Sequence, residues 1–246
     1  MTLFYPKLRI YVKILYMIQI LLNKTNFDGE WAAQTLYSLF SKDMKVVILP
    51  LSSKTGWASD YEDWSDRFQY GSEYNKDLVR PFLRYGISRK NITILNHFDE
   101  DEEHLNYVLN NADVICLSGD NPVDSLNCLL DLNIISTLMN FDGILITLGA
   151  AASIQSEFFP VYDGLGSFSE KEGLGVLQGV DLEMDYQETD EHLKHIIQTV
   201  EDRNRKVIIC PKDSGILLTD THTELLGNAF IADENDLDEM YNLYNE

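Results

Sequence analysis

The chain has 246 residues, 45% of them hydrophobic, which is enough for one sizeable core. Forty acidic residues against nineteen basic ones give a net charge of −21 at pH 7. Such a charge repels nucleic-acid phosphates and anionic lipid headgroups, so we expect neither nucleic acid nor a membrane as a partner.

The apolar stretch of residues 9–22 is the first element of the chain. It is shorter than the roughly 20 apolar residues of a membrane span, and no small-residue cleavage site follows it. We therefore expect it to contain the first core strand, over residues 18–22. A start at Met17 fits this interpretation, with residues 1–16 as an upstream extension and residues 17–246 as a single domain.

Short apolar runs alternate with helical segments along the rest of the chain. Strands are predicted over residues 18–22, 45–51, 91–95, 113–117, 143–147 and 206–210. Helices are predicted over residues 29–39, 76–86, 101–111, 123–130, 131–140 and 188–200. Continuous apolar strands are typical of parallel sheets covered on both faces. The alternation predicts an α/β fold with a mainly parallel central sheet, whose site forms at the carboxyl ends of the strands.

Two segments rich in acidic residues have less regular patterns. Residues 52–75 mix acids with aromatic side chains, and a surface helix with a buried aromatic stripe is favoured there over a substrate-facing lid. Residues 233–246 predict a solvated acidic helix.

The three cysteines, Cys116, Cys128 and Cys210, have no metal-binding spacing, and two of them lie in apolar strand-like runs. We expect core residues of a reduced, cytoplasmic protein, without a disulfide or a zinc site.

An unusual stretch of small residues follows the predicted strand at 143–147. The apolar run ends in Gly149, three alanines and a serine before apolar residues resume. A buried strand that turns sharply into a helix has this pattern, and in many hydrolases such a turn carries the nucleophile. A close contact between helix and strand, without chemistry, is the other interpretation of this segment taken alone.

Three motifs in chain order resemble one family. The small-residue turn resembles a G-x-S-A-G-A elbow, residues 118–122 resemble a G-G-N turn, and residues 173–189 resemble a G-L-G-L-L…D-I-E-V-H-Y-E-E-T segment. These motifs belong to the serine peptidase family that includes dipeptidase E (aspartyl dipeptidase) and cyanophycinase. The resemblance covers roughly residues 17–233. It implies a three-layer, class I glutamine amidotransferase-like sandwich.

The resemblance places substitutions at both catalytic positions. Gly149 stands where the family has its nucleophilic serine, and Asp185 stands where it has its histidine. A glycine supplies no oxygen, and a carboxylate with an ordinary pKa of about 4 is a weak base. Asp163 lies near the place of the family's histidine-orienting acid, with no histidine to orient. The loss of both halves of the relay argues against the family's peptidase mechanism.

The same resemblance implies an altered oxyanion hole. In the family, a backbone N–H of the G-G-N turn and the N–H after the nucleophile form this hole, which implies Gly119 and Ala150 here. Asp120 replaces a glycine of that turn. A carboxylate then lies where an oxyanion should be stabilised.

Rearranged chemistry is the alternative. Ser153 lies about one helical turn beyond Gly149, where its hydroxyl is expected to point away from the oxyanion hole. A water positioned by Asp185 is a second route, and a divalent cation held by Asp120, Asp163 and Asp185 is a third. Nothing in their spacing establishes a site, so no metal or cofactor is predicted.

A histidine pair is the other metal candidate. His192 and His195 are three residues apart on a predicted helix, but no third ligand is evident. We expect an exposed polar helix face there rather than a metal site.

The leading hypothesis is a catalytically degenerate member of the family that binds a small peptide, a carboxylate or a protein partner. The alternatives are an active peptidase or amide hydrolase with a rearranged site, and a structural interaction protein whose pocket has filled in. A homo-oligomer is compatible with each of these hypotheses.

Overall fold

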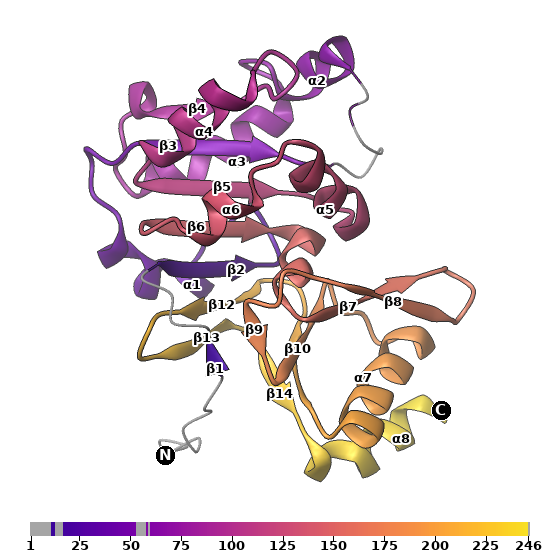
Figure 1. Cartoon of the computed structure of the whole chain (residues 1–246). Helices are drawn as coiled ribbons and strands as arrows, with labels where there is room; N and C mark the ends of the chain where they lie inside the picture. The colour runs from indigo at the N-terminus through magenta and orange to yellow at the C-terminus, as the bar shows by residue number, and fades with distance from the viewer. Residues whose placement is uncertain (1–10, 13–16, 53–57, 59, 246) are drawn as a thin grey trace.

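The computed structural model describes residues 11–12, 17–52, 58 and 60–245. Its centre is a seven-stranded sheet in the order β13-β12-β2-β6-β5-β3-β4 (Figure 1). The strands are β2 (Ile18–Leu22), β3 (Val46–Pro50), β4 (Ile92–Ile94), β5 (Val114–Ser118), β6 (Ile144–Leu148), β12 (Ser214–Leu218) and β13 (Thr223–Gly227). The strands β2 to β6 pair in parallel, and β12 and β13 add an antiparallel edge. The predicted α/β fold with a mainly parallel sheet is confirmed.

Helices cover both faces of this sheet (Figure 1). One face packs against α1 (Glu30–Leu36), α2 (Tyr61–Phe68) and α3 (Glu73–Arg84), and the other against α4 (Glu102–Asn110), α5 (Pro122–Asp131) and α6 (Ile135–Met139). Successive strand side chains point to opposite faces. Val46 and Ile48 therefore join the first layer, whereas Val47 and Leu49 join the second. The three-layer sandwich follows from strands that are apolar on both faces.

The aromatic segment forms α2 and the start of α3. Trp64 and Phe68 are buried on one side of α2, as the predicted surface helix with a buried stripe requires. Asp60 and Ser72 cap α2 and α3 by accepting hydrogen bonds from backbone N–H groups of the first turns. Residues 53–57 and 59, which belong to the same predicted segment, lie outside the described residues.

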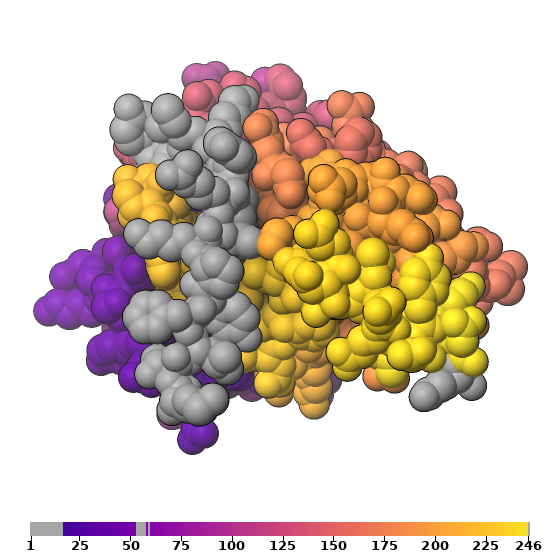
Figure 2. Space-filling view, turned by 90° about the horizontal axis from the view of Figure 1, so that it is seen from below, coloured from indigo at the N-terminus to yellow at the C-terminus, as the bar shows by residue number. Residues whose placement is uncertain are grey.

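The last third of the chain builds a second sheet beside the first. In it β10 (Val180–Met184) pairs in parallel with β11 (Lys206–Cys210), and β11 pairs antiparallel with β14 (Phe230–Ala232). Two helices, α7 (Asp190–Arg203) and α8 (Leu237–Tyr244), share an apolar cluster with this sheet. Figure 2 shows the C-terminal segment in yellow lying against the orange segment that contains α7. The acidic tail is therefore not a fully solvated helix, because Met240 of α8 is buried in that cluster.

The remaining elements are short strands and 3₁₀ helices. They are β1 (Tyr11–Val12), β7 (Phe158–Tyr162), β8 (Phe168–Glu172) and β9 (Leu177–Gln178), with the 3₁₀ helices η1 (Tyr37–Leu39), η2 (Arg89–Asn91), η3 (Gly149–Gln155) and η4 (Glu234–Asp236). The strands β7 and β8 form an antiparallel hairpin, and β1 pairs with β9. Most of the predicted upstream extension, residues 1–10 and 13–16, lies outside the described residues.

The three cysteines are buried and unpaired, which confirms their prediction as core residues. Over the part of the chain that the structure describes, no helix has both the length and the apolar character needed to cross a membrane.

Candidate functional site

The small-residue turn lies at the carboxyl end of β6. The strand ends at Leu148, and Gly149 adopts a φ of +73° as it begins the 3₁₀ helix η3. A Cβ atom on Gly149 would lie 2.7 Å from the carbonyl oxygen of Gly119, closer than real Cβ contacts allow. The predicted strand-to-helix turn is present, and both its backbone conformation and its surroundings require glycine at this position.

The neighbouring turn after β5 is tied to this elbow by two backbone hydrogen bonds. The N–H of Gly119 donates to the carbonyl of Leu148 at 3.1 Å, and the carbonyl of Gly119 accepts from the N–H of Ala151 at 2.9 Å. The Gly119 N–H is thus already used and is not left for an oxyanion beside Ala150, which corrects the expectation for Gly119. An acceptor, the Gly119 carbonyl oxygen, faces Gly149 instead.

Asp185 meets this elbow from the second sheet. It follows β10, adopts a φ of +54°, and its half-exposed carboxylate accepts a hydrogen bond from the ammonium of Lys24 at 3.1 Å. A cavity of about 380 Å³ is lined by Asn23, Lys24, Asp120, Gly149, Ala150 and Asp185. The structure therefore brings four of the predicted site residues to one place, although Asp185 and Gly149 follow strands of different sheets.

Asn23 and Lys24 were missed by the sequence analysis. They directly follow β2, which pairs in parallel with β6, so their position at the carboxyl end of a central strand was the available signal.

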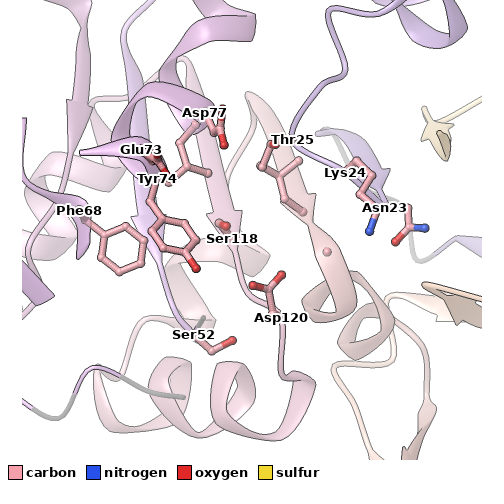
Figure 3. Close-up of a pocket in the computed structure, with 13 residues that line it drawn as sticks. Asn23, Lys24, Thr25, Ser52, Phe68, Glu73, Tyr74, Asp77, Ser118 and Asp120 are labelled. Carbon is pink, nitrogen blue, oxygen red and sulfur yellow. The ribbon is translucent and has the colours of Figure 1, made fainter. Parts of the chain in front are cut away.

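An adjoining cavity of about 400 Å³ extends from the elbow toward α2 and α3. Figure 3 shows Glu73, Tyr74 and Asp77 on one side of it, and Asn23, Lys24 and Thr25 on the other. Ser52, Phe68, Ser118 and Asp120 line it as well. Phe68 and Tyr74 of the 52–75 segment therefore face this cavity, and Phe68 also packs in the core layer beside the sheet.

Ser153 and Asp163 do not join the site. The hydroxyl of Ser153 donates to the carbonyl of Ala150 at 2.7 Å, and the side chain is buried. Asp163 accepts hydrogen bonds from the N–H groups of Leu165 and Ser167 in the β7–β8 turn. Neither residue lines the two cavities. Among the described residues, no three His, Cys, Asp or Glu side chains are placed to hold a metal ion.

The histidine pair on α7 is turned inward. Glu183 of β10 is completely buried, and its two carboxylate oxygens lie 2.6 Å from the Nδ1 atoms of His192 and His195. The hydroxyl of Tyr162 donates to the same carboxylate, also at 2.6 Å. The expectation of an exposed polar helix face is therefore wrong. The two side chains turn inward because they bind a buried carboxylate on another element, which the helix sequence does not reveal.

The charged groups of this cluster shift one another's pKa values. Burial alone raises the pKa of Glu183, but hydrogen bonds from His192 and His195 outweigh it and hold that pKa below its usual value. Burial lowers the pKa of His195, yet the carboxylates of Glu170 and Glu183 raise it to about 9. The hydrogen bond from His195 is the main reason that the pKa of Glu170 falls to about 2.

These shifts predict a stability optimum between pH 4.5 and 6.5. The raised pKa of His195 contributes to the free energy of unfolding. This contribution is complete below the ordinary pKa of 6.5 and is lost as the pH rises through about 9. The contribution of Glu170 is complete above its ordinary pKa of 4.5 and is lost as the pH falls through about 2. Urea unfolding at pH 6, 7.5 and 9 should show a decline of about 1–3 kcal/mol toward pH 9.

The control for this pH dependence is His195→Gln, which removes the titrating group. We expect the variant to be less stable at pH 6 and to show a smaller decline toward pH 9. An equal decline in the variant and the unmodified protein would assign the pH dependence to other groups.

Solved structures share this fold. A candidate peptidase E protein from Listeria monocytogenes EGD-e has a TM-score of 0.58 and 13% sequence identity, covering 85% of this chain and 97% of its own. A peptidase from an acI-B1 Actinobacterium has a TM-score of 0.58 and 14% identity, covering 91% of this chain and 96% of its own. No protein-family model and no curated protein sequence matches the chain. The likeness therefore shows a peptidase E-like fold.

Proposed function

We propose that this chain is a peptidase E-like protein without the family's hydrolytic chemistry, and that it binds a small peptide in the two cavities beside Gly149. The observation that carries the proposal is the elbow itself. Its tip is a glycine at a positive φ, with the Gly119 carbonyl oxygen in the space that a side chain would need. A covalent mechanism at this point has no nucleophile.

The residues that line the cavities also support the proposal that the catalytic base is absent. The cavities are lined by carboxylates, hydroxyls, an amide and one lysine, with no histidine or cysteine among the described residues. The carboxylate of Asp185 is paired with Lys24, so the residue in the place of the family's histidine is held by an ion pair. A hydroxyl without a neighbouring base is a weak nucleophile at neutral pH.

The size of the site supports binding. Each cavity has a volume of about 400 Å³ or slightly less, within the range of about 300–1,000 Å³ that is usual for small-molecule sites. Polar side chains of α3, and of the residues that end or follow β2, β5 and β10, converge on it. Such a lining suits a short peptide better than a wholly apolar ligand.

The test is hydrolysis of Asp-X dipeptides and blocked peptides by the purified protein. We expect no product above a mock-purified control, because neither a nucleophile nor a base is in place. A serine-reactive phosphonate should also fail to label Ser153, whose buried hydroxyl is bonded to the Ala150 carbonyl. Hydrolysis above the control, or labelling at Ser153, would overturn the proposal in favour of a rearranged active site.

A further inference from the structure

The larger of the two cavities has an apolar wall. Large apolar side chains of α2, α3 and β6 form this wall: Phe68, Tyr74, Leu78 and Leu148. Tyr74 and Leu78 are four residues apart and therefore lie on the same face of α3. Among the described residues that line the smaller cavity, none has a large apolar side chain. An apolar side chain of a bound peptide therefore finds its packing partners in the larger cavity.

Two side chains of this wall are aromatic and already contact each other. The ring centroids of Phe68 and Tyr74 lie 5.8 Å apart, with the ring planes tilted by 55°, within the favourable range for aromatic pairs. Trp64 contacts the Phe68 ring in turn, at a centroid distance of 5.4 Å. Trp64 and Phe68 are buried, whereas Tyr74 is 38% exposed. The row of three rings thus ends at Tyr74, where one ring face is still available to a ligand.

The position of this ring in the cavity suits a peptide that spans it. Figure 3 shows Phe68 and Tyr74 on one side of the cavity, with Asn23 and Lys24 on the other and the Tyr74 hydroxyl directed into the space between. A ligand ring beside Tyr74 would extend the row, because aromatic pairs stabilise beyond the area that they bury. The backbone of the same peptide would then lie toward the polar side chains on the opposite side.

We infer that the larger cavity binds an aromatic side chain of the peptide ligand, packed against the rings of Tyr74 and Phe68. The inference rests on the proposed peptide site and narrows its ligands to peptides that carry phenylalanine, tyrosine or tryptophan. An aliphatic side chain gains the burial of apolar surface but not the contact between rings. A methyl side chain gains little of either.

The experiment is an NMR titration of the purified protein with three blocked peptides: acetyl-Phe-Ala-amide, acetyl-Leu-Ala-amide and acetyl-Ala-Ala-amide. We expect the phenylalanyl peptide to bind about threefold to tenfold more tightly than the leucyl one. The alanyl peptide should bind most weakly. All three peptides are uncharged, so the net charge of −21 does not discriminate among them.

Substitutions of Tyr74 locate the effect. Tyr74→Leu keeps an apolar side chain but removes the ring, and it should reduce the preference for phenylalanine over leucine to about twofold or less. Tyr74→Phe keeps the ring and should retain the preference. The matched control is Tyr70→Leu in the same segment. Tyr70 is 83% exposed, lies against Arg89 and lines neither cavity, so its substitution should leave the preference unchanged.

The outcomes separate this inference from the proposed function. Equal binding of all three peptides, or equal binding of the phenylalanyl and leucyl ones, would overturn the aromatic preference while leaving the peptide site intact. Binding of none of them would overturn both. A preference that Tyr74→Leu and Tyr70→Leu reduce equally, or that Tyr74→Leu leaves unchanged, would also overturn the inference, because the cavity wall would then not be its source.

Discussion

Replacement of Glu183 by alanine is expected to lower the free energy of unfolding by about 3–5 kcal/mol, the usual cost of removing one partner from a buried charge cluster. The Glu183 carboxylate accepts hydrogen bonds from Tyr162, His192 and His195 and is completely buried. Without it, the buried His195 retains one carboxylate neighbour, Glu170 at 3.6 Å. Glu183 thus joins β10 to α7 and to the β7–β8 hairpin, and its loss should loosen the packing of these three elements.

Urea unfolding at pH 6 measures this loss. Glu183→Gln keeps the shape and removes the charge, and we expect it to be destabilised less than the alanine variant. Glu188→Ala, at an exposed position in the loop before α7, serves as the control and should change stability by about 0.5 kcal/mol or less. A loss below about 1 kcal/mol in Glu183→Ala would contradict the role of the cluster in holding these elements together.

Replacement of Gly149 by alanine is expected to lower the free energy of unfolding by about 2–4 kcal/mol. A non-glycine residue at a positive φ costs about 1–2 kcal/mol. A Cβ placed 2.7 Å from the Gly119 carbonyl oxygen adds a steric cost, because that oxygen belongs to backbone bonded to Ala151. The turn after β5 must move before any side chain fits at the elbow.

Gly164 provides the matched control for this substitution. Its φ is +70°, close to that of Gly149, but a Cβ there would meet no atom within 4 Å. Gly164→Ala therefore measures the conformational cost alone, and the difference between the two variants measures the steric part. Equal losses in both variants would show that the Gly119 turn moves away freely.

The close approach of the Gly119 carbonyl oxygen to Gly149 also predicts the behaviour of a variant that carries a serine and a histidine at the two positions. Gly149→Ser combined with Asp185→His introduces the two residue types that the sequence resemblance implies for these positions. The turn at Gly119 still opposes the new serine, and the Gly119 N–H is still bonded to Leu148. We expect this double variant to hydrolyse no Asp-X dipeptide above the control. Hydrolysis by the double variant alone would show that the turn adjusts and that the proposed loss of chemistry lies only in these two side chains.

Local sequence patterns were sufficient to predict much of the fold of this protein. The apolar strands that alternate with helices predicted the central sheet, because such strands are buried on both faces. The run of small residues from Gly149 predicted the elbow, since only small side chains allow the helix and strand backbones to approach closely. The apolar runs around Cys116 and Cys210 predicted the burial of these two cysteines. These features depend on residues that are neighbours in sequence, and short-range geometry was sufficient for each.

The tertiary structure alone decided the rest. His192 and His195 have the pattern of a polar helix face, but Glu183 of another element draws them inward. The partner of the Gly119 N–H is Leu148, 29 residues further along the chain. The charged side chains that line the two cavities lie on α3 and shortly after β2, β5 and β10, and no local pattern groups them together. Hydrogen bonds and charge pairs depend on distances of a few ångströms between segments far apart in sequence, so folding must bring those segments together before such interactions exist.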